Sequence, residues 1–177
     1  MPPVANAHQL GSFLARAVPV FALYLIEARS LRQCGTISDQ FAAVARHYGF
    51  DAYVVAEPGH FMNEVVTSNG IFRIDMTAAQ FRDTPYEDNL RTLLAEIVEN
   101  PYRAATFKRI ARLSPAARLP TAPVPGLYDP VPKFDRYAAK VVPRLLAGRL
   151  DPRDELDQDY LRLLRGKTFG SKLHRRR

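Results

Sequence analysis

Residues 60–77 contain the pattern that most limits how this chain can fold. Two runs that alternate apolar and polar side chains, HFMNEVVT (60–67) and IFRIDMT (71–77), are separated by Ser68-Asn69-Gly70. An Asn-Gly pair between two such runs is the strongest short-range signal of a β-hairpin. The sequence therefore predicts two antiparallel strands joined by a tight turn.

The register of this hairpin decides which of its side chains meet. With Asn69 and Gly70 in the turn, Asp75 lies opposite Glu64, and residues two apart on a strand share a face. Asp75 is then on the same face as His60, and a longer loop or a bulge would bring the two closer together. Glu64 could either reinforce His60 or pair with Arg73, and the pair with Arg73 is favoured.

A helix and a strand are predicted directly before the hairpin. Residues 51–57, DAYVVAE, are aromatic and β-branched and end at Pro58-Gly59, which is typical of a strand and a turn. Residues 35–48 carry apolar side chains at helical spacing, and Gly49 follows as a stop signal. Cys34, the only cysteine in the chain, is therefore expected at the start of this helix.

Further helices are predicted on both sides of this segment. Asn6 is a suitable N-cap for a first helix, and Pro19 predicts a break before a second helix over about residues 20–31. After the hairpin, residues 86–100 and 101–113 have the composition and spacing of two more helices.

The last third of the chain differs in composition from the rest. Residues 114–132 contain six prolines, which predicts an extended, semi-rigid connector. Helical patterns follow at about 133–147 and 153–165. The predicted organisation is a core domain (1–113), a Pro-rich connector (114–132), a helical C-terminal extension (133–165) and a basic tail (166–177).

The net charge of +7 is concentrated at the C-terminal end. Seven cations lie between Arg162 and Arg177, whereas all 18 acidic residues lie at or before Asp159. These cations equal the whole excess, so residues 1–161 are formally neutral. A neutral body argues against a nucleic-acid-binding domain, but the tail is expected to bind polyanions weakly or to dock to acidic partners.

We expect a cytoplasmic protein without a membrane partner. The longest apolar run, Ala17–Ile26, is about half of the roughly 20 residues needed to span a bilayer. The first residues lack the basic segment and cleavage site of a signal peptide. Secretion by a specialised system stays open.

Cys34 is the candidate nucleophile, because a helix N-terminus stabilises a thiolate. Acyl transfer by a thiol also needs a general base and a group that orients it. Of the four histidines, His8 and His174 lie near the chain ends, and His47 lies at the far end of the helix that Cys34 begins. His60 is therefore the candidate base, and Asp75 is the candidate orienting acid.

No cofactor or metal is expected from the sequence. One cysteine and four dispersed histidines do not have the spacing of a zinc site, and no Gly-rich phosphate-binding loop occurs.

The order of these elements resembles that of the transglutaminase-like superfamily of papain-type cysteine enzymes. The resemblance covers about residues 30–80: a cysteine that opens a helix, HYGF that closes it, a strand, and then HFMNEVVTSNGIFRIDMT. It implies an α+β fold with a papain-like core, in which a Cys-bearing helix packs on a small antiparallel sheet, with additional N- and C-terminal helices. It also implies that Cys34 is the nucleophile, His60 the general base and Asp75 its partner. Met62 stands where the family usually has an aromatic residue.

The function implied is thiol-dependent acyl transfer on a peptide or protein amide, or on an ester. Hydrolysis, deamidation and transamidation all fit this chemistry. Gln33 and the backbone of Gly35 are candidates for binding the oxyanion. The alternative is a catalytically inactive domain of the same fold that serves as a structural or protein-binding module. Its C-terminal helices and basic tail would then contact the partner.

Overall fold

Within the described residues, the strands form a five-stranded antiparallel sheet in the order β4-β3-β2-β1-β5. The computed structural model describes residues 5–28, 32–82, 86–100, 102–121, 129–154, 157–158 and 160–161. The strands are β1 (Asp51–Glu57), β2 (His60–Thr67), β3 (Gly70–Asp75), β4 (Thr106–Ile110) and β5 (Ala117–Arg118).

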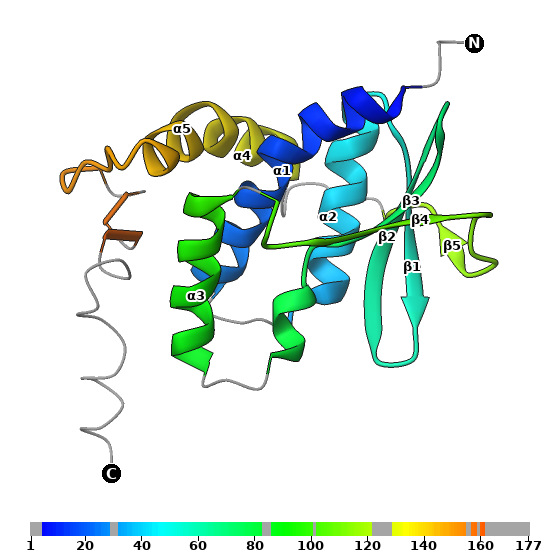
Figure 1. The fold of residues 1–177 in the computed structure, drawn as a ribbon, viewed down its shortest axis with the longest axis horizontal. Helices are drawn as coiled ribbons and strands as arrows, with labels where there is room; N and C mark the ends of the chain where they lie inside the picture. Colours follow the sequence, from blue (N-terminus) through cyan, green and yellow to red (C-terminus); the bar gives the residue numbers. More distant parts are fainter. Residues whose placement is uncertain are drawn as a thin grey trace.

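The helices gather on one side of this sheet, and α2 packs against β1 and β2 (Figure 1). The helical elements are α1 (Ala7–Ala28), α2 (Cys34–His47), the 3-10 helix η1 (Ala78–Phe81), α3 (Tyr86–Glu99), α4 (Pro130–Arg136), the π-helical turn η2 (Tyr137–Val141) and α5 (Val142–Leu146). The predicted α+β class is confirmed. The predicted start of a helix at Cys34 and the predicted strand 51–57 are also confirmed.

An aromatic cluster joins α1, α2 and α4 into the hydrophobic core. The ring of Phe13 lies 6.0 Å from that of Phe41 and 5.7 Å from that of Phe134, and Phe21 contacts the same two rings. All four side chains are fully buried. Burial of each such side chain contributes about 1.5–3 kcal/mol, so this cluster holds α2 firmly behind the sheet.

The prediction that Pro19 breaks the first helix is wrong. Residues 7–28 form one continuous helix with Pro19 inside it. Proline removes one backbone hydrogen bond and crowds the preceding turn. The neighbours Val18, Val20 and Phe21 are buried in the core, and their packing outweighs that local cost.

Residues 7–27 of α1 are long and apolar enough to cross a membrane by length and composition. In the folded chain, 72% of the 18-residue apolar window of this segment is buried against the rest of the protein. Core helices and N-terminal signal sequences share these properties, so the helix does not by itself place the chain in or out of a membrane.

The prediction of a helix over residues 101–113 is also wrong. Thr106–Ile110 forms the edge strand β4 and pairs with β3, from Asp75 opposite Thr106 to Ile71 opposite Ile110. Helix propensity is a weak preference, and an open strand edge with unpaired backbone groups overrides it.

The first part of the predicted connector belongs to the sheet. Ala117 and Arg118 form β5 on the free edge of β1, and Arg118 Nη1 donates to Asp39 Oδ1 of α2 at 3.0 Å. The backbone N–H of Thr121 donates to the same carboxylate. Residues 114–121 are thus bound to the core, while residues 122–128 lie outside the described part.

The first predicted C-terminal helix is confirmed as the helical run from Pro130 to Leu146, and it packs on the core. Its buried residues include Phe134, Tyr137 and Leu145. Among the described residues of this run, the large hydrophobic side chain that stays exposed is Leu146.

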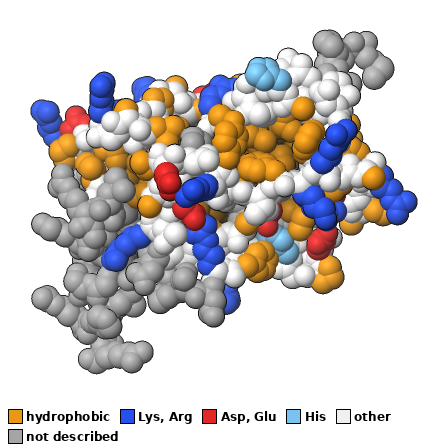
Figure 2. Space-filling view, in the orientation of Figure 1, with side chains coloured by type: hydrophobic (Ala, Val, Ile, Leu, Met, Phe, Trp, Pro, Cys, Tyr) orange, Lys and Arg blue, Asp and Glu red, His pale blue; other side chains and the backbone are white. Residues whose placement is uncertain are grey.

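Figure 2 shows hydrophobic side chains gathered near the middle of one face of the molecule, with Lys and Arg around them. The predicted helix 153–165 lies mostly outside the described residues, and the basic tail 166–177 lies entirely outside them.

The turn of the β2–β3 hairpin is shifted by one residue toward the N-terminus relative to the predicted turn at Asn69-Gly70. Thr67 pairs with Gly70, so Ser68 and Asn69 form the turn. Asn69 is tied to α1, because its Oδ1 accepts from the N–H of Ala7 at 3.0 Å. Gly70 has a φ of 135°, and a Cβ there would lie 2.9 Å from Arg109 Nε. Both the backbone conformation and the close side chain explain why glycine follows the turn.

Candidate active site

Cys34 occupies the first position of α2 and is half-buried. The N-cap residue Gln33 has no capping side-chain hydrogen bond, and the first turn contains no acidic residue. The intrahelical bonds of this end begin with the N–H of Ile37, which donates to Gln33 O at 2.8 Å. The first N–H groups of a helix lack intrahelical acceptors, so the end of α2 at Cys34 carries a partial positive charge.

The fully buried Asn63 fixes α2 against the sheet. Its Nδ2 donates to Ser38 O of α2 at 2.8 Å and to Tyr53 O of β1 at 3.2 Å. One side chain on β2 therefore connects the helix that carries Cys34 to two strands. No local pattern in the sequence indicates this role of Asn63.

His60 and Asp75 form a direct hydrogen bond. His60 Nε2 lies 2.8 Å from Asp75 Oδ2, and the two side chains are 10% and 14% exposed. The observed register explains this contact: Asn63 pairs with Ile74, so the next residue, Asp75, lies across from Met62. His60 is then the diagonal neighbour of Asp75 on one face, within reach of a long side chain. The predicted position of Asp75 opposite Glu64 is corrected by two residues, which preserves the face.

The other carboxylate oxygen of Asp75 is held by Thr77. Asp75 Oδ1 accepts from the N–H of Thr77 at 2.8 Å and from its hydroxyl at 3.1 Å. Thr77 is itself buried. The sequence Asp-Met-Thr therefore has a physical role: the threonine fixes the carboxylate, which leaves Oδ2 directed at His60.

The 3-10 helix η1 covers the remaining side of His60. Gln80 Nε2 lies 2.7 Å from His60 Nδ1, and the Phe81 ring makes an edge contact with the imidazole at a centroid distance of 4.8 Å. Phe81 is 64% exposed, the largest value among the exposed large hydrophobic side chains of the described residues. Neither residue was a sequence-based candidate, because no local pattern indicates that this segment folds back onto β2.

The start of α2 contacts the start of β2 next to Cys34 and His60. The position of a Cβ on Gly35 would lie 3.6 Å from a ring carbon of Phe61. Cys34 precedes Gly35, and His60 precedes Phe61, so both candidate residues flank this contact. By alternation, Phe61 and Asn63 share the face of β2 toward α2, and His60 leaves the strand on the other side. The hydrogen bonds found among the described residues include none between Cys34 and His60.

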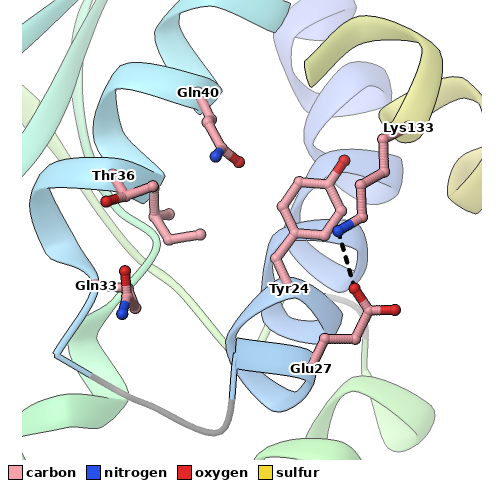
Figure 3. Close-up of a pocket in the computed structure, with 7 residues that line it drawn as sticks. Tyr24, Glu27, Gln33, Thr36, Gln40 and Lys133 are labelled. Atoms are coloured by element: carbon pink, nitrogen blue, oxygen red, sulfur yellow. Dashed lines mark ion pairs between the residues drawn. The ribbon is translucent and has the colours of Figure 1, made fainter. Parts of the chain in front are cut away.

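Gln33 lies in a pocket that His60 does not line. It lines a pocket of about 350 Å³ between α1, the first turns of α2 and α4. Figure 3 shows Lys133 reaching from α4 to Glu27 of α1, where their charged groups are 2.9 Å apart. The described residues that line this pocket do not include Cys34 or His60.

Glu64 pairs with Arg73, as the sequence predicts. Glu64 is fully buried and accepts from Arg73 Nη2 at 2.7 Å and from the N–H of Ser114 at 2.7 Å. Arg73 also donates to Glu57 at 2.9 Å. The carboxylate of Glu64 is thus used to hold the segment before β5 against the sheet.

Within the described part of the chain, no group of three or more His, Cys, Asp or Glu side chains is arranged to hold a metal ion. Comparison of the chain with protein-family models, with curated proteins and with solved structures found no match.

Proposed function

We propose that this protein is a thiol-dependent acyl-transfer enzyme with a papain-like, transglutaminase-like core. Cys34 is the nucleophile, His60 the general base and acid, and Asp75 the residue that orients His60. The observation that carries the proposal is the 2.8 Å bond between His60 Nε2 and an Asp75 carboxylate that Thr77 holds in place. A buried, anchored acid on an imidazole is the arrangement that general-base catalysis needs.

The carboxylate determines which imidazole nitrogen acts as the base. An ionised carboxylate only accepts hydrogen bonds, so His60 Nε2 carries the proton and Nδ1 carries the lone pair. In the proposed reaction, which requires the Cys34 thiol at the start of α2 to reach the His60 ring at the start of β2, Nδ1 takes the proton of the thiol as sulfur attacks the carbonyl carbon. The backbone N–H groups at the start of α2 stabilise the oxyanion. The bond to the leaving nitrogen or oxygen breaks as Nδ1 returns the proton, and water or an amine then releases the acyl group from sulfur.

The substrate class proposed is a peptide or protein amide, with esters as simpler substrates. Phe81, which is exposed and in edge contact with His60, gives an extended substrate an apolar side chain to bind. Hydrolysis, deamidation and transamidation differ only in the leaving group and the second nucleophile.

A second candidate function is a non-catalytic structural or protein-binding module. Two points favour it: both ring nitrogens of His60 already have partners, and strand alternation puts His60 on the face of β2 opposite Phe61, which contacts α2. His60 would then serve to connect β2, β3 and η1. Binding of a partner through the C-terminal helices belongs to this alternative.

Covalent trapping separates the two functions. The protein is mixed with p-nitrophenyl acetate, and the product is digested and mapped by mass spectrometry. The proposal predicts an acetyl group on Cys34 and release of p-nitrophenol that disappears in Cys34→Ser. Ester cleavage that continues unchanged in a folded Cys34→Ser variant would contradict it and favour the non-catalytic module.

A further inference from the structure

We infer that Gln80 is a positioning residue for His60. In the free protein its side-chain amide donates a hydrogen bond to the base nitrogen Nδ1, and the side chain rotates away when substrate binds. The inference rests on the proposed function, because it concerns the same histidine. It is carried by the 2.7 Å contact between Gln80 Nε2 and His60 Nδ1, which the proposed reaction does not itself require.

The hydrogen-bond pattern defines which group donates in this contact. Asp75 accepts from Nε2–H of His60, so Nδ1 has a lone pair and is an acceptor. The amide nitrogen of Gln80 is a donor only, and it therefore donates to Nδ1. The lone pair that must accept the thiol proton is thus occupied by the chain itself.

The backbone that carries Gln80 is held firmly. Its N–H donates to Thr77 O at 3.0 Å, and the buried Asn89 of α3 donates to Ala79 O at 2.9 Å. The Gln80 side chain is only half-buried. Release of Nδ1 therefore requires rotation of one side chain toward solvent rather than movement of η1.

This arrangement makes the base available only in the fraction of molecules in which Gln80 has rotated away. A single neutral hydrogen bond shifts such an equilibrium by about 2- to 10-fold. Removal of the donor should raise every reaction that uses the Nδ1 lone pair by about this factor. Reactions at other histidines should not change.

The test compares Gln80→Ala with the full-length wild-type chain. Diethyl pyrocarbonate, which modifies an unprotonated imidazole nitrogen, is applied at pH 7, and the rate at His60 is measured by peptide mapping. His47 is exposed and serves as the internal reference. The rate of Cys34 alkylation by iodoacetamide is measured in the same samples. Gln40→Ala is the matched control, because Gln40 lines the pocket between α1, α2 and α4.

We expect Gln80→Ala to raise both the His60 and the Cys34 rates by about 2- to 10-fold, with His47 and the Gln40→Ala control unchanged. Gln80→Met, which keeps the volume but lacks the donor, serves if the alanine variant does not fold. Unchanged His60 rates in the folded variants would overturn this inference and leave the proposed function intact. A rise at His60 without a rise at Cys34 would overturn the link between Gln80 and the reaction. Failure of the proposed function is detected by a different measurement, namely ester cleavage that continues unchanged in the Cys34→Ser variant.

Discussion

At the scale of single residues, Asp75 uses its two carboxylate oxygens for different purposes. Oδ1 accepts two hydrogen bonds from Thr77, and Oδ2 faces His60 Nε2. Because the Thr77 donors require an acceptor, an asparagine at this position would keep its oxygen on Thr77. Its amide nitrogen would then face His60.

Asp75→Asn should therefore reverse the tautomer of His60. The asparagine amide donates to Nε2, the imidazole proton moves to Nδ1, and the base loses its lone pair. We expect acyl transfer to fall on the order of 10²-fold or more, by analogy with other triads, while the fold is kept. Acylation rates with an activated ester and ¹⁵N NMR of the His60 ring measure both effects. A folded variant with wild-type acylation rates would show that Asp75 has only a structural role.

The sequence predicts the pair of His60 and Asp75 for a simple reason. Strand side chains repeat every two residues, so a register error of two residues leaves both groups on the same face. Gln80 was not predictable in this way. It lies after the strand, and its contact with His60 depends on how η1 packs against α3 through Asn89.

At the scale of elements, local sequence signals predict α2 and the first three strands, but they do not predict the strand that depends on long-range pairing. Hydrophobic spacing and Gly49 predict α2, and the turn residues predict the first three strands. Residues 106–110 carry no comparable local signal, since the partner that makes them a strand is the edge of β3, over thirty residues earlier. Such a contact is decided by the assembled sheet and not by the segment itself.

Asn63 connects the elements around the candidate site, and its replacement tests that connection. Asn63→Leu keeps the approximate volume but removes both donated hydrogen bonds and leaves Ser38 O without this partner. We expect a loss of about 2 kcal/mol in the free energy of unfolding, measured by urea denaturation. Asn100→Leu, at an exposed position, should cost clearly less. Equal losses in the two variants would contradict the role assigned to Asn63.

The junction of α2 and α4 should depend on alkaline pH. The Tyr48 hydroxyl donates to Asp135, and this hydrogen bond, burial and the Asp135 charge raise the pKa of Tyr48 above its ordinary value of 10.0. A group with a raised folded-state pKa contributes stability below its unfolded-state pKa and loses that contribution as the pH rises through the folded-state value. Tyr48→Phe should therefore show a shallower loss of stability above about pH 10. Because Tyr48 is partly exposed, the difference at neutral pH should stay below about 1 kcal/mol. Identical pH profiles from thermal melts would contradict this assignment.

At the scale of the whole molecule, the described residues form one hydrophobic core that includes side chains from α1 to Tyr160. Residues predicted as a separate extension, such as Phe134 and Leu145, belong to it. Composition predicts which segments are apolar enough to be buried, but it does not indicate which segments share a core. The charge asymmetry is different, because it follows directly from the sequence.

Deletion of residues 166–177 tests the prediction that the basic tail is separable from the folded body. The truncated chain keeps every described residue, so its melting temperature and its Cys34 chemistry should match those of the full chain. It should elute from a heparin column at lower salt, because fewer cations replace counterions on the polyanion. A truncated chain that fails to fold would contradict the modular picture, and unchanged elution would assign polyanion binding to the body.

The measurement that tests the central claim most directly is the dependence of Cys34 reactivity on His60. The rate of alkylation by iodoacetamide at pH 7 is compared between the wild-type chain and His60→Ala, with circular dichroism to verify that the variant is folded. If Nδ1 of His60 accepts the thiol proton, the variant should react more slowly by about tenfold or more. Equal rates in two folded proteins would show that Cys34 and His60 do not act together, and the proposed acyl-transfer site would be wrong.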